Sequence, residues 1–170
     1  MASESRFFSS SLNLRYAIFL IAVSLWCFFI IAAPWLASHE HAFSSGLIYL
    51  FFSKICHQIP ERSFFIFGKQ LTVCSRCTGL YFGFLVGALC YPFLFNLHRI
   101  SAPSPKYLLL ACIPIGIDIF IRTFHIAENT FASRSITGLI LGATTILFVA
   151  PGILSLRFKN NSPQISKFHK

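Results

Sequence analysis

The chain has 170 residues, of which 55% are hydrophobic and only 11% are charged. Soluble domains carry about 25% charged residues, so these few charges exclude a water-soluble fold of this size. The net charge of +9 does not indicate nucleic-acid binding, because the lysines and arginines flank apolar runs and form no continuous basic face. The composition predicts a single domain that contacts the lipid bilayer and has no nucleic-acid partner.

Four apolar segments are long enough to cross a bilayer, which takes about 20 residues in a helix. In chain order they cover roughly residues 16–35, 78–95, 107–124 and 136–156. A cleaved signal peptide is the alternative for the first segment, although its apolar run is long for that role. The third segment is the weakest candidate, because it contains Pro114, Asp118 and Arg122.

A shorter apolar segment, residues 43–55, precedes the first cysteine. It is too short to cross the bilayer, so we expect an interfacial or re-entrant helix there. The predicted fold is therefore all-α and polytopic, with four transmembrane helices plus this short helix. Residues 1–158 form a single transmembrane domain, and residues 159–170 form a polar tail.

The basic residues predict the orientation, because they favour the cytoplasmic side of a membrane. We expect both termini to be cytoplasmic. The inner side then holds the larger share of the 14 lysines and arginines, namely Arg6, Arg15, Arg99, Lys106, Arg157, Lys159, Lys167 and Lys170.

The chemistry-bearing motifs are Cys56-His57 and Cys74-x-x-Cys77, between the first two long apolar segments. Thiolates and imidazole at this spacing suit a tetrahedral Zn²⁺ or a thiol redox centre. Cysteines three residues apart at a helix start share a face near the positive helix end, which favours thiolate, and Arg76 strengthens that effect. We predict Cys56, His57, Cys74 and Cys77 as metal ligands. Zn²⁺ is the expected metal, and Cu⁺ is the alternative for soft ligands.

Four antiparallel crossings place several polar residues on the same membrane face as the cysteines. We predict Arg62, Arg76, Asp118 and Arg134 as cofactor-binding residues. Three alternatives are open for Arg62 and Arg76: pairing with acids, binding lipid phosphate, or holding an anionic or quinone-like ligand. Asp118 has three alternative roles: a pair with Arg122 four residues on, a pair with Arg134, or an acid near the site. His125 and Glu128 are expected on the same face.

Glycines recur every fourth residue in the second and fourth long segments, at Gly79, Gly83 and Gly87 and at Gly138 and Gly142. Small residues at this spacing let helices approach closely in lipid. The two segments are therefore predicted to pack against each other or against copies of the chain.

The runs CHQIPERSFF (56–65) and VCSRCTGLYFG (73–83), with Gly68 between them, resemble a widespread family of small bacterial and archaeal membrane proteins. Asp118 and residues 134–138 look like later motifs of this family, which is known only as a domain of unknown function. The resemblance covers roughly residues 54–142. It implies an integral protein of a bacterial or archaeal cell membrane with a Cys/His site, and it implies no established activity.

Three functions remain open from the sequence. The first is a metal-binding membrane protein. The second is a thiol–disulfide enzyme, similar to quinone-linked disulfide-forming enzymes, in which Cys56 exchanges with a Cys74–Cys77 pair; the second cysteine pair that those enzymes need is missing on this side. The third is a non-catalytic subunit or assembly factor of a membrane complex, or a homo-oligomer.

Overall fold

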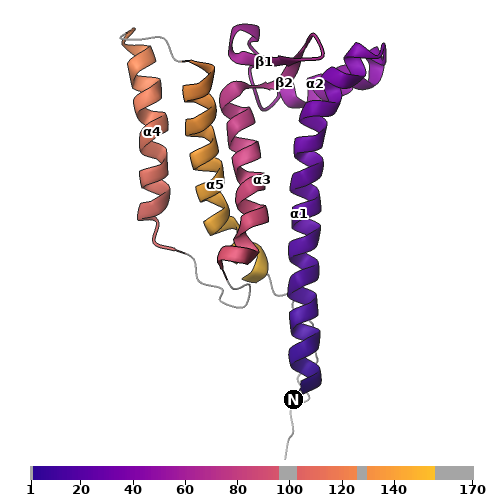
Figure 1. Ribbon diagram of the computed structural model, residues 1–170, viewed down its shortest axis with the longest axis vertical. Coiled ribbons are helices and arrows are strands. Elements are labelled where there is room, and N and C mark those ends of the chain that lie inside the picture. Colours follow the sequence, from indigo (N-terminus) through magenta and orange to yellow (C-terminus); the bar gives the residue numbers. More distant parts are fainter. Residues whose placement is uncertain (1, 96–102, 126–129, 156–170) are drawn as a thin grey trace, which may run out of the picture.

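The computed structural model describes residues 2–95, 103–125 and 130–155, with side chains from residue 13 onward. Figure 1 shows long helices side by side, with a short helix and a hairpin at one end. In chain order the elements are α1 (Ala2–Ser38), α2 (Ala42–Ser53), the 3-10 turn η1 (Pro60–Arg62), β1 (Ser63–Ile66), β2 (Lys69–Cys74), α3 (Ser75–Leu94), α4 (Lys106–Thr123) and α5 (Phe131–Ser155).

Three stretches of helix in these ranges are long and apolar enough to cross a membrane: Asn13–Ser38, Ser75–Leu94 and Phe131–Ser155. They correspond to the first, second and fourth predicted spans. Helix α4 occupies the third position but does not qualify by composition, because Lys106, Asp118 and Arg122 lie within 18 residues. The prediction of four spans is thus confirmed for three of them.

The all-α prediction is wrong in one respect, because β1 and β2 form a two-stranded antiparallel sheet. Ile66 pairs with Lys69, so the strands are joined by the two residues Phe67 and Gly68. Both have positive φ, 56° and 69°. Such a turn matches the right-handed twist of the strands. Phe67 is an unusual residue for this conformation, which explains why the sequence carries no strong hairpin signal.

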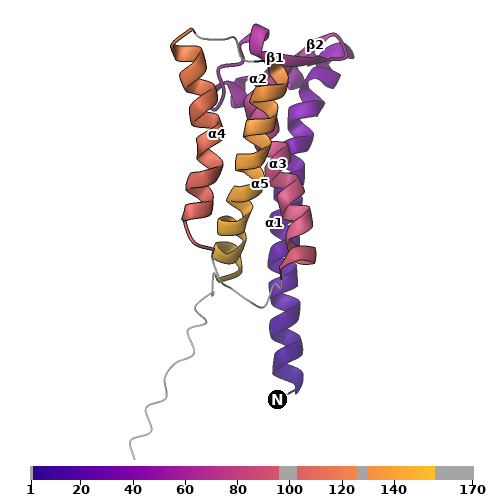
Figure 2. The same cartoon turned by 60° about the vertical axis from the view of Figure 1, so that its left-hand side comes forward.

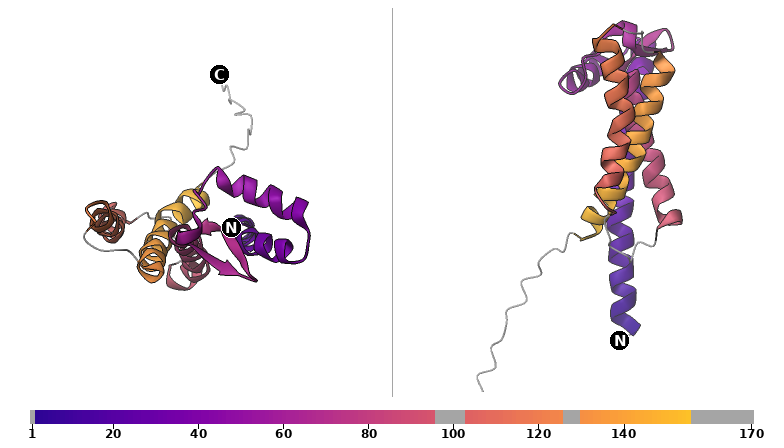
Figure 3. Two further views of the ribbon diagram at one scale, coloured as in Figure 1. Left: turned by 90° about the horizontal axis from the view of Figure 1, so that it is seen from above. Right: turned by 90° about the vertical axis from the view of Figure 1, so that its left-hand side faces the viewer.

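The short helix predicted before the first cysteine is present as α2. Seen from above in Figure 3, α2 and the hairpin lie across the end of the long helices. The Ser45 hydroxyl donates to the Ala33 carbonyl of α1 at 2.9 Å, and Ile30 of α1 is buried against Phe52 of α2 and Val73 of β2. These contacts make one apolar layer beneath the hairpin.

Helices α3 and α5 lie side by side (Figure 2), and glycines of both helices line the contact, which we call the glycine seam. A Cβ atom added at Gly79 would collide with the Ser135 backbone, and one added at Gly142 would collide with the Leu80 backbone. Gly83 and Gly138 are equally tight. The prediction that the second and fourth long segments pack against each other is confirmed.

We expect Gly142→Ala to destabilise the protein by about 1–3 kcal/mol, the usual cost of overpacking a close contact. The measurement is unfolding of the purified protein in mixed detergent micelles. Gly116→Ala in α4 is the matched control, because a Cβ there meets nothing within 4 Å. Equal stability of the two variants would contradict the tight seam.

Several predictions concern residues outside the described ranges. They are the polar tail 159–170, Glu128 and the basic residues Arg99, Arg157, Lys159, Lys167 and Lys170; of Arg6 only the backbone is described.

Candidate metal centre

Three of the predicted ligands meet at the end of the molecule covered by the hairpin. The Sγ atoms of Cys56, Cys74 and Cys77 all lie within 4.8 Å of one another. Cys56 follows α2, Cys74 ends β2, and Cys77 lies in the first turn of α3. All three are free thiols, as are the other three cysteines of the chain.

The hairpin is what returns the chain from Cys56 to Cys74. Gln58 fixes the segment after Cys56, because its Nε2 donates to the carbonyls of Tyr49 and Thr72 at 2.9 Å each. Gln70 Nε2 donates in turn to the Gln58 carbonyl at 2.6 Å. These bonds hold the two ends of the loop together.

The surroundings favour thiolate at Cys56. The backbone N–H of Cys74 donates to Cys56 Sγ at 3.2 Å. Hydrogen bonds from the thiols of Cys74 and Cys77 lower the pKa of Cys56 from its ordinary value, and they outweigh the opposing effect of burial.

The three sulfurs fit a tetrahedral metal ion. A Zn–S bond is about 2.3 Å long, so two thiolates on one tetrahedral Zn²⁺ lie about 3.8 Å apart. The group is within 4.8 Å before any ligand moves, so binding needs only shifts of about 1 Å. Cys56 is buried against Ile30, Leu71 and Val73, which shields one side of the site from water.

His57 lies outside this group. Its side chain is exposed, and it is not among the clustered donors of the described residues. Its role as the fourth ligand therefore stays a prediction.

Asp118 takes part in a link between helices at the same end of the molecule. Its Oδ2 forms a salt bridge with Arg76 of α3, and its Oδ1 accepts a hydrogen bond from the Ser133 hydroxyl of α5 at 2.5 Å. The carboxylate is 5% exposed. The sequence names Arg122 and Arg134 as its partners and misses Arg76, which lies 42 residues away in the chain.

The remaining predicted contacts are less well placed for a common cofactor. Arg62 closes η1 and Arg134 lies in the first turn of α5, both half-buried. Neither is part of the cysteine cluster. Their role toward an anionic or quinone-like cofactor stays a prediction.

Residues 56–148 match the model of a family described as "Predicted membrane protein (DUF2085)". The chain belongs to this family. The match begins at Cys56 and contains the cysteine cluster, Asp118 and Arg134.

Two archaeal relatives extend the match. The chain is 38% identical to the uncharacterized protein MJ1492 of Methanocaldococcus jannaschii over 149 residues, 85% of this chain and 96% of that protein. It is 40% identical over 91 residues to an uncharacterized protein of Methanothermobacter thermautotrophicus, covering 54% of this chain and 80% of that one. No solved structure matches. The protein is therefore a membrane protein of this family, with a cysteine cluster able to hold a metal ion.

Proposed function

We propose that this membrane protein holds one Zn²⁺ on Cys56, Cys74 and Cys77 at one face of the bilayer. The observation that carries the proposal is the approach of three free Sγ atoms to within 4.8 Å of one another. A disulfide needs two sulfurs, whereas a structural metal site needs at least three fixed donors. Thiolate donors select Zn²⁺ or Cu⁺ over Mg²⁺ and Ca²⁺.

The metal would order the segment between Cys56 and Cys77. Its three ligands come from the end of α2, the end of β2 and the start of α3, so one ion ties together three elements. Structural Zn²⁺ in zinc-finger peptides binds with an apparent free energy of about 10 kcal/mol or more. A hairpin of two short strands has little core of its own, so such a contribution is large there.

We further propose that α4 crosses the membrane as the fourth span. Helices α3 and α5 both begin at the end that carries the cysteines, so the chain must return between them, and α4 is the helix that lies between them in the chain (Figure 1). Its 18 residues extend about 27 Å at 1.5 Å per residue. The salt bridge to Arg76 neutralises the Asp118 charge, which removes the main obstacle in its composition. With both termini cytoplasmic, the cysteine cluster then faces the outside of the cell.

The test is metal analysis of detergent-purified protein combined with alkylation mass spectrometry. We expect about one equivalent of zinc, and Cys56, Cys74 and Cys77 protected from alkylation until a chelator is added. Absence of metal together with a Cys74–Cys77 disulfide that cycles with a quinone would favour the thiol–disulfide enzyme. Partners among membrane proteins, a homo-oligomer included, stay predictions.

His57→Ala separates two forms of the site. If His57 is the fourth ligand, the variant should lose at least about tenfold in zinc affinity, because loss of even an outer-shell partner of a ligand costs about 10–100-fold. If water fills the fourth position, as in zinc sites with three protein ligands, the affinity stays unchanged. Zinc competition with a chromophoric chelator measures the difference, and His41→Ala, outside the cluster, is the control.

A further inference from the structure

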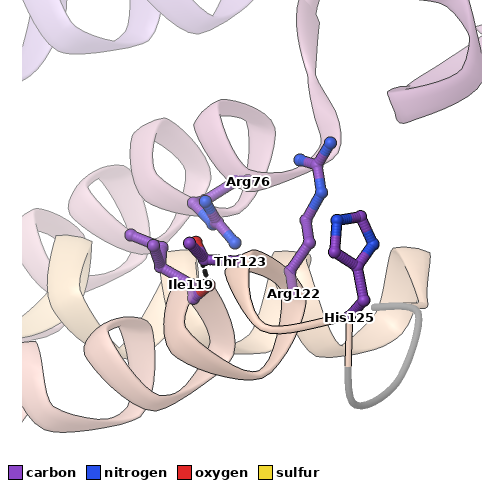
Figure 4. Close-up of a pocket in the computed structure, with 5 residues that line it drawn as sticks. All are labelled: Arg76, Ile119, Arg122, Thr123 and His125. Carbon is purple, nitrogen blue, oxygen red and sulfur yellow. Dashed lines mark hydrogen bonds between the residues drawn. The ribbon is translucent and has the colours of Figure 1, made fainter.

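A second polar site lies beside the cysteine cluster, on the side of Arg76 that faces α4. It is a pocket of about 450 Å³ lined by Arg76, Ile119, Arg122, Thr123 and His125. Figure 4 shows Arg122 and His125 extending from the end of α4, with Arg76 on α3 across from them. The pocket therefore lies between two helices at the face that carries the cysteines.

The donors of this pocket are nitrogen atoms of cationic or imidazole side chains. One guanidinium nitrogen of Arg76 is taken by Asp118, but its buried Nε has no hydrogen-bond partner within the described part of the chain. The Thr123 hydroxyl is already used, since it donates to the Ile119 carbonyl at 2.9 Å. Among the residues that the structure describes, no carboxylate lines the pocket. Two guanidinium groups and an imidazole thus face this cavity, and the described lining residues bring no carboxylate into it.

The backbone supports this arrangement. His125 has a φ of 53°, a left-handed conformation that is uncommon for residues other than glycine. Its N–H donates to the Arg122 carbonyl at 3.1 Å, so the chain turns sharply as α4 ends. That turn brings the imidazole back beside Arg122, where both line the pocket. Strained conformations of this kind cluster at ligand sites.

We infer that this pocket binds a phosphate-class oxyanion. The guanidinium group of arginine can donate two parallel hydrogen bonds to two oxygens of a phosphate, and both Arg76 and Arg122 line this pocket. The volume lies within the range of small-molecule sites, about 300–1,000 Å³, so it admits a phosphate that carries a substituent. The bound anion would join α3 to α4. Two sources share this chemistry, a phospholipid headgroup and a free phosphate compound. The inference does not depend on the zinc site.

The experiment uses the full chain, purified and delipidated in detergent, and two probes. Inorganic phosphate is titrated and followed by thermal unfolding, and dioleoyl phosphatidylglycerol is added and followed by native mass spectrometry, with dioleoyl phosphatidylcholine as the neutral comparison. Arg122→Gln should weaken binding of the effective probe about tenfold or more, the effect of one charge-assisted hydrogen bond. His125→Asn, whose side chain tolerates the left-handed turn, should weaken it several-fold. Lys69→Gln removes an exposed charge outside the pocket and should change nothing.

Each outcome either supports or overturns the proposed oxyanion site. Saturable binding of phosphate that Arg122→Gln weakens identifies a free oxyanion site. Selective retention of phosphatidylglycerol that the same variant loses identifies a lipid headgroup site. If neither probe distinguishes Arg122→Gln from Lys69→Gln, the inference is overturned. Zinc content is measured in the same samples and should be equal in all variants, so that failure of this inference is separable from failure of the metal proposal.

Discussion

Cys77→Ala is expected to abolish stoichiometric zinc binding. The variant leaves only Cys56 and Cys74 as clustered thiols, and two thiolates do not make a closed tetrahedral site. The loss extends to the fold, because the ion would connect α3 to the ends of α2 and β2. We expect faster proteolysis within residues 56–74 as this end of the molecule opens. The measurements are zinc per protein by mass spectrometry and the time course of limited proteolysis.

The matched control is Cys90→Ala. Cys90 lies on the same helix, is exposed and is outside the cysteine cluster. This variant should keep one equivalent of zinc and the proteolysis pattern of the unmodified protein. Retention of full zinc by Cys77→Ala would contradict the proposed ligand set, whatever its effect on stability.

Asp118→Ala should destabilise the protein by about 3 kcal/mol, the lower end of the cost of breaking a buried ion pair. The lower end applies because the Arg76 side chain keeps 27% of its surface exposed, so some water reaches the guanidinium after the carboxylate is gone. Ser133 loses its acceptor at the same time. Denaturant unfolding in mixed micelles measures the change in the free energy of unfolding.

The double variant Arg76→Met, Asp118→Leu provides the control for charge. It removes both partners and fills the space with apolar atoms, so much of the lost stability should return. If Asp118→Ala alone is as stable as the unmodified protein, the contacts of Asp118 that link α3, α4 and α5 do not contribute to the free energy of unfolding.

The cysteine cluster, the salt bridge of Asp118 and the contact with α5 all involve residues at the start of α3. Cys77 reaches toward the hairpin, and Arg76, one residue earlier, reaches toward α4. Gly79 lets α5 approach at the next turn. The close contact of α3 with α5 also supports the link at Asp118. Ser133 of α5 donates a hydrogen bond to Asp118, and Arg76 of α3 pairs with the same carboxylate.

The sequence predicted the parts of this arrangement that depend on short spacing. Cys74 and Cys77 lie together because they are three residues apart, with Cys74 at the N-cap of α3 and Cys77 in its first turn. The glycine repeats at every fourth position predicted the contact of α3 with α5, because a helix places residues at this spacing on one face. Three of the four spans that the apolar runs predicted are present as long apolar helices, because length and hydropathy are local properties.

What the sequence could not supply depends on contacts between distant segments. The salt bridge of Asp118 with Arg76 joins residues 42 positions apart, and the closer Arg122 was the more obvious partner. The hairpin was missed because its Phe67-Gly68 turn lacks an Asn or Asp at the first position. The role of His125 in a pocket follows from a backbone turn that carries no pattern in the sequence.

Zinc-edge X-ray absorption of the unmodified protein tests the central proposal most directly, since it reports the atoms bound to the metal. Three sulfur ligands at about 2.3 Å, with one nitrogen or oxygen at about 2.0 Å, are the expected first shell. A shell of nitrogen and oxygen atoms alone, or protein that takes up no zinc with its three thiols reduced, would contradict the account.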